Sequence, residues 1–303
     1  MGPLAWLQVG LLLAMAATVA TKSWQDHPWL GVALSAVTVL AWLPEIWRPR
    51  MRRWWFVYVA GTFIYTLFRS IADETAMPVR TDYPIRLDHL FLGGTDPVVW
   101  LQQRWFDPSH LTWLDSAAVM VHWSFFIAPH LAAVLIFLFR RELFARYAVL
   151  VVGSMYLSLV LFFLVPTAPP WLAAQSGALP GAFRVMDFVG GRVHVQTYQS
   201  FYAALAEPNS VAAMPSLHMA ITVAMLLWAL DHHRRLAPLL AVYALLMALA
   251  LMYLAEHYLV DIVAGAGLAL ALHLVVRRLV PAGIDCAAPV ESDAADDAQA
   301  ARW

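Results

Sequence analysis

Charged side chains and cysteine are both scarce in this sequence of 303 residues. Asp, Glu, Lys and Arg make up 13% of the chain, Lys22 is the single lysine, and the formal net charge is −1. A net charge this close to zero excludes a nucleic-acid partner. Cys286 is the only cysteine, which excludes an intramolecular disulfide and any metal cluster held by several thiolates.

Apolar residues dominate the composition instead. They make up 62% of the chain, and the mean hydropathy is +0.66, outside the range of soluble globular proteins. A transmembrane helix needs about 20 apolar residues. We therefore expect an all-α integral membrane protein with about eight transmembrane helices, near residues 3–20, 29–46, 54–71, 113–139, 147–165, 215–231, 236–256 and 258–276.

The arginines predict the orientation of these helices. They cluster after the second, fourth, sixth and eighth segments, as Arg48, Arg50, Arg52 and Arg53, as Arg140, Arg141 and Arg146, as Arg234 and Arg235, and as Arg277 and Arg278. Basic residues favour the cytoplasmic side, so the N- and C-termini are expected there. The long loops 72–112 and 166–214 then face the extracytoplasmic side, and the Ala- and Asp-rich tail 281–303 is expected to be a disordered cytoplasmic segment.

Histidine and aspartate interrupt the last apolar run in a pattern that carries chemistry. His257 and Asp261 are four residues apart, so a helix places both on one face. The carboxylate can hold one ring nitrogen and leave the other free as a nucleophile. His218, at the start of the sixth segment, lies on the same predicted side of the membrane. It could act as general acid in a phosphoryl transfer through phosphohistidine.

Several motifs together resemble one family. The second and third signature motifs of the type 2 phosphatidic acid phosphatase superfamily are similar to Pro215-Ser216-Leu217-His218 and His257-Tyr258-Leu259-Val260-Asp261. Two further segments resemble the branch that contains inositol phosphorylceramide synthases and many bacterial relatives. They are Val165-Pro166-Thr167-Ala168-Pro169-Pro170-Trp171 and the stretch 209–214, which begins at Asn209.

The resemblance implies a fold and an activity. Residues 54–280 would form a six-helix catalytic core, and residues 1–53 two additional N-terminal transmembrane helices. The implied activity is that of a lipid phosphatase or phosphotransferase of a bacterial cell membrane, with an extracytoplasmic site and neither metal nor cofactor. Its substrate would be a membrane lipid with a phosphate ester, and a phospho-inositol or phospho-sugar headgroup could pass to a polyol or sugar acceptor. His257 would be the nucleophile, His218 the acid and Asp261 its orienting partner.

One element of the superfamily pattern is missing. The usual opening motif, a lysine, six further residues and then Arg-Pro, cannot be formed by this chain, so other cations must hold the phosphate. Arg69 and Arg184 are our candidates, and Arg192 is a weaker one. Ser216 and Asn209 are further candidate substrate-binding residues, because the start of a helix offers free N–H groups to an anion. Pro215 is expected in the first turn of that helix.

Other interpretations remain open at this point. Intramembrane His, Asp and Arg also occur in transporters and proton relays, and a haem carrier could use His122 and His130. Hydrogen bonding between helices is the plainer explanation for both histidines, although His122 could support the catalytic site. His194 has no assigned role. The apolar stretch 86–106 forms either a helix at the membrane interface or a cap over the outer helix ends.

Overall fold

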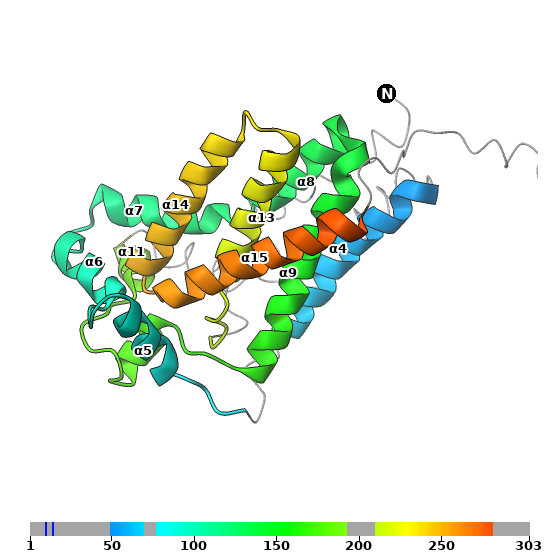
Figure 1. The fold of residues 1–303 in the computed structure, drawn as a ribbon. Helices are drawn as coiled ribbons and strands as arrows, with labels where there is room; N and C mark the ends of the chain where they lie inside the picture. The colour runs from blue at the N-terminus through cyan, green and yellow to red at the C-terminus, as the bar shows by residue number, and fades with distance from the viewer. Residues whose placement is uncertain (1–9, 11–13, 15–48, 70–76, 193–209, 281–303) are drawn as a thin grey trace, which may run out of the picture. The chain divides into compact units, whose positions relative to one another are not determined.

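The computed structural model describes Gly10, Ala14 and residues 49–69, 77–192 and 210–280 (Figure 1). By its internal contacts the chain divides into two compact units, Met1–Phe56 and Val57–Trp303. Apart from Gly10 and Ala14, which are helical, the predicted helices 3–20 and 29–46 and the tail 281–303 lie outside the described residues. Within the described ranges every regular element is helical, and extended backbone pairs only through isolated bridges of Thr167 with Arg80 and Ala212.

The described helices fall into long apolar helices and short helices between them. The longer ones are α4 (Pro49–Arg69), α7 (Trp113–Ser124), α8 (Ala128–Phe139), α9 (Phe144–Leu164), α13 (Leu217–His232), α14 (Ala237–Tyr253) and α15 (Leu259–Leu279). The short ones are α5 (Asp82–Phe91), α6 (Pro97–Trp105), the 3₁₀ turn η1 (Arg141–Leu143), α10 (Pro170–Gln175) and α11 (Val185–Arg192).

Each of the six segments expected between residues 54 and 276 is helical. Among the described residues, Arg141–Leu164 and Leu259–Leu279 are long and apolar enough to cross a membrane, and α7 with α8 makes a third span if the bent pair counts as one. The helices α13 and α14 are apolar but shorter. The chain is thus an all-helical membrane protein in its described part, and the total of about eight spans remains a prediction.

The segment 113–139 is bent where a straight span was expected. The helices α7 and α8 meet at 46°. The turn between them is held by bonds over three residues, such as Phe125 N–H to the His122 carbonyl at 3.2 Å. Pro129 stands in the first turn of α8 and has no N–H to continue the ladder of α7. The bend follows from this proline and ends α7 two residues after His122.

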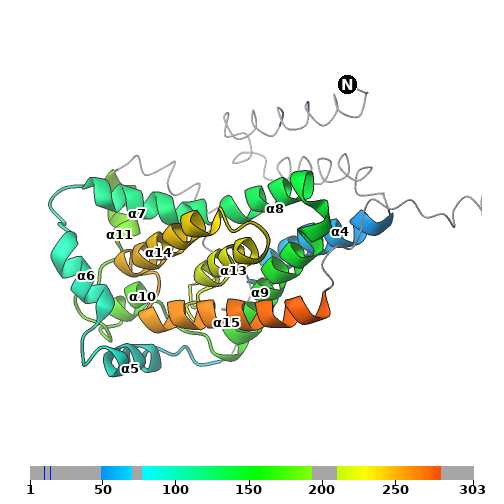
Figure 2. The same cartoon turned by 45° about the horizontal axis from the view of Figure 1, so that its top comes forward.

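The helix α13 is the centre of the bundle. It packs against α15, α14 and α9, and α14 in turn packs against α7 (Figure 2). The short helices α5 and α6 contact α15 and α14 respectively. The stretch 86–106 therefore packs onto the helical core, as the cap interpretation expects.

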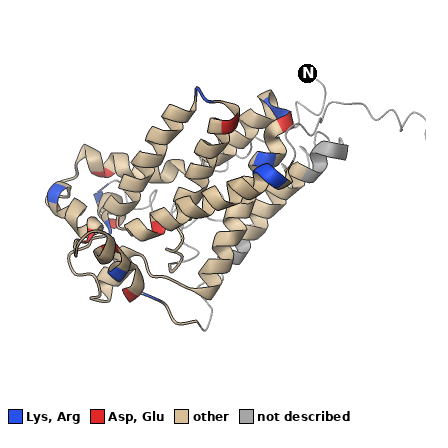
Figure 3. Cartoon of the chain, in the orientation of Figure 1, with Lys and Arg blue, Asp and Glu red and all other residues tan. Residues whose placement is uncertain are grey.

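Most of the arginines on the long helices α8, α9, α13 and α15 and their connections lie at one end of the bundle (Figure 3). Figure 3 shows blue residues at the α8–α9 connection, at the α13–α14 turn and near the end of α15. Arg146 Nε donates to the Val280 carbonyl at 2.9 Å, and Arg277 pairs with Asp231 at 3.3 Å. Asp231 is at the C-terminal end of α13. The opposite end of that helix, which carries His218, is roughly 20 Å away at 1.5 Å per residue.

Candidate active site

His257 and Asp261 lie side by side in the core. Asp261 is fully buried and His257 is 4% exposed. Asp261 Oδ2 is 3.4 Å from His257 Nδ1 and also accepts the Tyr258 N–H at 3.0 Å. Because Tyr258 is the N-cap of α15, this carboxylate caps the helix and contacts the imidazole at once. The contact at Nδ1 leaves Nε2 of His257 as the nitrogen available for chemistry.

His218 completes a line of three side chains. Its Nδ1 is 3.3 Å from His257 Nε2, which is within hydrogen-bond distance. The two rings therefore meet at the His257 nitrogen that Asp261 does not contact. The placement of His218 depends on the start of α13, where the Ser216 side chain accepts the Met219 N–H at 3.3 Å. Ser216 is therefore the N-cap and Pro215 precedes the helix. The expectation that Pro215 lies in its first turn was wrong, because the hydroxyl two residues before His218 supplies the cap.

The two catalytic helices touch through backbone atoms. The Ser216 N–H donates to the Asp261 carbonyl at 3.0 Å. A Cβ placed on Gly265 would lie 2.2 Å from the Ser216 carbonyl oxygen. Only a residue without a side chain allows α15 to approach the start of α13 this closely. The distance between His218 and His257 is set by this contact.

The proline-rich segment holds the turn that precedes His257. Ala255, at the end of α14, has φ of 60° and is fully buried. This left-handed conformation costs a non-glycine residue about 1–2 kcal/mol. It is stabilised by the Trp171 N–H, which donates to the Ala255 carbonyl at 3.0 Å. The proline-rich segment thus supports the turn that precedes the nucleophile, and the Thr167 hydroxyl is hydrogen-bonded to the Tyr83 hydroxyl at 2.7 Å.

A carboxylate from outside the motifs caps the catalytic helix. The fully buried Asp88 of α5 accepts the N–H groups of Leu259 at 3.0 Å and Val260 at 2.8 Å. Burial raises the pKa of Asp88 to about 6, although both hydrogen bonds favour the charged form. Asp88 therefore ties the outer segment to the first turn of α15. Motif spacing does not single out Asp88, and its only signal in the sequence is an acidic residue within an apolar stretch.

Arg184 lies beside the nucleophile through Glu256. Its Nε is 3.3 Å from Glu256, its Nη1 is 3.6 Å from Asp187, and its guanidinium stacks 4.0 Å from the Trp171 ring centre. Burial raises the pKa of Glu256 above its ordinary value, and the charge of Arg184 opposes that shift. Glu256 was another residue that motif spacing did not single out.

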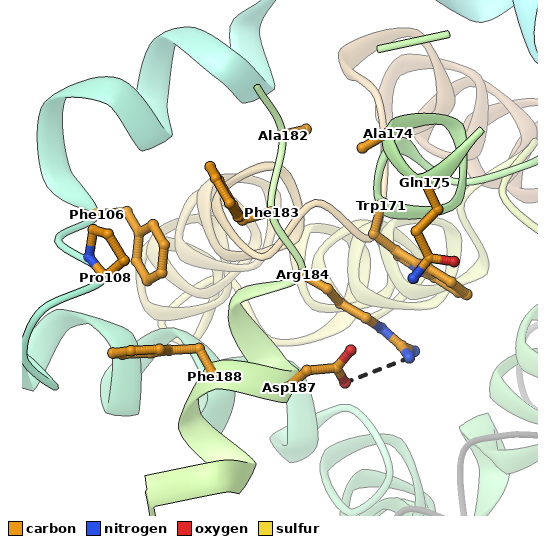
Figure 4. A pocket seen from close by; sticks show the side chains of 10 residues that line it. All are labelled: Phe106, Pro108, Trp171, Ala174, Gln175, Ala182, Phe183, Arg184, Asp187 and Phe188. Carbon is orange, nitrogen blue, oxygen red and sulfur yellow. Dashed lines mark ion pairs between the residues drawn. The ribbon is translucent and has the colours of Figure 1, made fainter. Parts of the chain in front are cut away.

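A cavity of about 380 Å³ adjoins Arg184 (Figure 4). Aromatic rings line one side, where Phe106 contacts Phe188 edge to face at 5.1 Å. The opposite side carries Arg184, Trp171 and Gln175. The cavity therefore offers an apolar wall and a polar wall next to the residue that precedes His257.

Gln102 fixes the segment that carries Arg184. Its side-chain nitrogen donates to the carbonyls of Phe183 at 2.8 Å and Tyr253 at 2.7 Å, and its oxygen accepts the Phe183 N–H at 2.8 Å. The amide is 3% exposed. One buried side chain of α6 thus connects the irregular segment that carries Arg184 to the end of α14, and this network was not anticipated from the sequence.

The remaining predicted site residues differ in their placement. Arg69, the last residue of α4, is close enough to His122 and His218 to interact electrostatically with both. Arg192 instead donates to the Ser109 carbonyl at 3.3 Å and stacks on Phe188, so these contacts hold it at an exposed surface. Asn209 and His194 lie outside the described residues.

The histidines of α7 and α8 do not converge. His130 Nδ1 is 2.9 Å from the Tyr58 hydroxyl, whereas the His122 ring lies 4.7 Å from that of His218. They share no common site of the kind that an axially ligated haem requires. Among the described residues, no group of three His, Cys, Asp or Glu side chains is arranged to hold a metal ion.

Comparison with known proteins assigns the family. The PAP2 superfamily model matches residues 86–275, which contain His218, His257 and Asp261, and the chain belongs to this superfamily. Over 167 residues it is 30% identical to the inositol phosphorylceramide synthase of Candida albicans, a match that covers 54% of this chain and 34% of the relative. The chain thus matches about a third of that relative's length. No solved structure matches. The superfamily and branch inferred from the motifs are confirmed.

Proposed function

We propose that this protein is a lipid phosphatase or phosphotransferase that works through a phosphohistidine at His257. The observation that carries the proposal is the buried line from Asp261 through His257 to His218, with the free Nε2 of His257 facing Nδ1 of His218 at 3.3 Å. Membership of the PAP2 superfamily and the likeness to an inositol phosphorylceramide synthase support a phosphate ester of a lipid as substrate.

The geometry permits a balanced two-step reaction. In the first step, His257 Nε2 bonds to phosphorus, the bond from phosphorus to the lipid oxygen breaks, and His218 gives its Nδ1 proton to the leaving oxygen. Asp261 stabilises the positive imidazole that forms. In the second step, water or an alcohol attacks phosphorus, His218 takes up the attacking proton, and the bond to His257 breaks.

Developing negative charge on the phosphoryl group requires cations nearby. Two unit charges 4 Å apart attract by about 4 kcal/mol at an effective dielectric constant of 20. Arg69 and Arg184 are both electrostatic neighbours of His122, which itself stacks on His218. We propose that these two arginines replace the lysine and arginine of the superfamily's missing opening motif. Ser216 and Asn209 remain proposed substrate-binding residues.

The active site is proposed to open at the extracytoplasmic face. Support comes from the basic clusters, which lie at the far ends of α13 and α15 from His218 and Asp261. Basic residues favour the cytoplasm. The cavity beside Arg184 could receive a hydroxyl-rich headgroup, because a polar wall faces an aromatic one.

The acceptor decides between phosphatase and transferase. Purified protein in micelles would be given ³²P-labelled phosphatidic acid or phosphatidylinositol, with and without added inositol or diacylglycerol as acceptor alcohols. Release of inorganic phosphate from phosphatidic acid, or of inositol phosphate from phosphatidylinositol, identifies hydrolysis, and label on the added alcohol identifies a transferase. The variant His218→Asn should lose either activity, whereas His130→Asn should keep it. Failure of the folded wild type to turn over either class of phosphate ester would contradict the proposal.

A further inference from the structure

A third histidine lies against the proposed acid. His122, on α7, is 3% exposed, and its ring centre is 4.7 Å from that of His218, with 35° between the ring planes. Phe126 contacts the same imidazole edge to face at 6.1 Å. His122 belongs to neither of the two histidine motifs. The position of α7 nevertheless places it in the same layer of side chains as His218 and His257.

Buried atoms around this layer lack hydrogen-bond partners. Within the described part of the chain, His122 Nδ1, His218 Nε2 and Asp261 Oδ1 are inaccessible and make no hydrogen bond. Buried polar atoms in proteins are nearly always paired, and an unpaired one lowers stability. Asp261 Oδ1 can only accept a hydrogen bond, but the nitrogens of the neighbouring His122 and His218 can donate one, and they indicate that a ligand with acceptor oxygens completes the site.

The charged groups around His122 indicate the sign of the charge on that ligand. Arg69, Arg184 and His257 all act on His122 electrostatically. No carboxylate is among the principal electrostatic influences on His122 or on His218. A neutral or cationic ligand would gain little from such surroundings, whereas a tetrahedral oxyanion would gain from every one of these groups.

We propose that His122 is a phosphate-binding residue, which donates a hydrogen bond from Nδ1 to a nonbridging oxygen of the phosphoryl group. The inference rests on the proposed function, and it adds a third ligand beside Arg69 and Arg184 in a chain that lacks the usual cationic motif. If His122 were only a packing residue, an aromatic ring of similar shape would serve equally well against His218.

Four variants separate binding from packing. His122→Phe keeps a ring against His218 and removes both nitrogens, while His122→Asn keeps an amide near the position of Nδ1, and His122→Gln moves the amide toward Nε2. His130→Phe is the matched control, because His130 is bonded to Tyr58 on the neighbouring element and not to the catalytic line. The probe is orthovanadate, titrated against the full-length protein in micelles.

Because His122→Phe removes a hydrogen bond to a charged ligand, we expect it to weaken vanadate binding by about ten- to a hundredfold and to lower kcat/KM by a similar factor. His122→Asn should recover at least part of both losses, and His130→Phe should match the wild type. Wild-type vanadate affinity in folded His122→Phe would overturn the inference. If His122→Phe does not fold, equal affinity in His122→Asn and His122→Gln would overturn it.

Failure of the function and failure of this inference give different results. A wild-type protein that neither binds vanadate nor turns over lipid phosphate contradicts the proposed function itself. A wild type that does both, together with an unaffected His122→Phe, contradicts only the role of His122.

Discussion

Gly265→Ala tests how closely the catalytic helices must approach. The added Cβ would lie 2.2 Å from the Ser216 carbonyl oxygen, 3.1 Å from its carbonyl carbon and 3.3 Å from the Ala220 nitrogen. Carbon and oxygen normally approach to about 3.3 Å, so the backbone at the start of α13 must move by about 1 Å. The obstacle is backbone rather than the flexible end of a side chain. The helix carrying His218 therefore shifts away from His257.

The movement affects catalysis more than folding. Overpacking in a core costs about 1–3 kcal/mol, which most folded proteins tolerate. A displacement of about 1 Å between reacting groups can lower a rate about a hundredfold. We therefore expect Gly265→Ala to fold with a lowered melting temperature and to lose about two orders of magnitude in kcat.

Gly267→Ala provides the control from the same helix. Nothing lies within 4 Å of a Cβ at that position, so activity should stay within about twofold of the wild type. Both variants would be assayed in micelles for lipid phosphate turnover, with intrinsic tryptophan fluorescence to follow unfolding. Wild-type kcat in Gly265→Ala would refute the claim that this contact sets the separation of His218 and His257.

Three further changes test the supporting residues. Gln102→Leu leaves three backbone groups without their partner, which should cost about 2–4 kcal/mol of stability and weaken vanadate binding; Gln102→Glu serves as a comparison of similar shape. Because burial raises the pKa of Asp88 to about 6, the folded state holds its proton more tightly than the unfolded state, and stability falls as pH rises through 6. The free energy of unfolding of the wild type relative to Asp88→Asn should therefore fall by on the order of 1 kcal/mol between pH 4 and 7, which a falling relative melting temperature would show, while the wild type shows no such fall relative to Asp107→Asn. Arg184→Lys should recover only part of the vanadate affinity lost in Arg184→Ala, because an ammonium group cannot bind two oxygens as a guanidinium does. The control variant Arg192→Ala should bind vanadate like the wild type. Equal losses of affinity at Arg184 and Arg192 would show that the wrong cation was chosen.

The catalytic line could be predicted because its signals are local. Spacing of four residues on a helix places His257 and Asp261 on one face wherever the helix lies. The interruption of the apolar run at these residues also located the turn between α14 and α15. Long apolar segments predicted α9 and α15 to within three residues at each end, since the length of an apolar run is read directly from the sequence.

The supporting residues could not be predicted because their partners are distant in sequence. Asp88 bonds to backbone groups more than 170 residues away, and Gln102 connects segments 81 and 151 residues from it. Neither periodicity nor motif spacing reports such contacts. His122 lies two residues before the end of α7, and only the packing of α7 against the core brings it to His218. The expected place of Pro215 failed for a smaller reason, since Ser216 was the stronger capping residue.

Trapping of the covalent intermediate tests the central claim most directly. Purified wild type and His257→Ala would be mixed with ³²P-labelled phosphatidic acid, quenched in alkaline detergent, and mapped by peptide mass spectrometry. The account predicts label on the wild type that is stable to base and labile to acid, carried by the peptide that contains His257, and none on the variant. Equal labelling of the two proteins, or label on a peptide without His257, would contradict it.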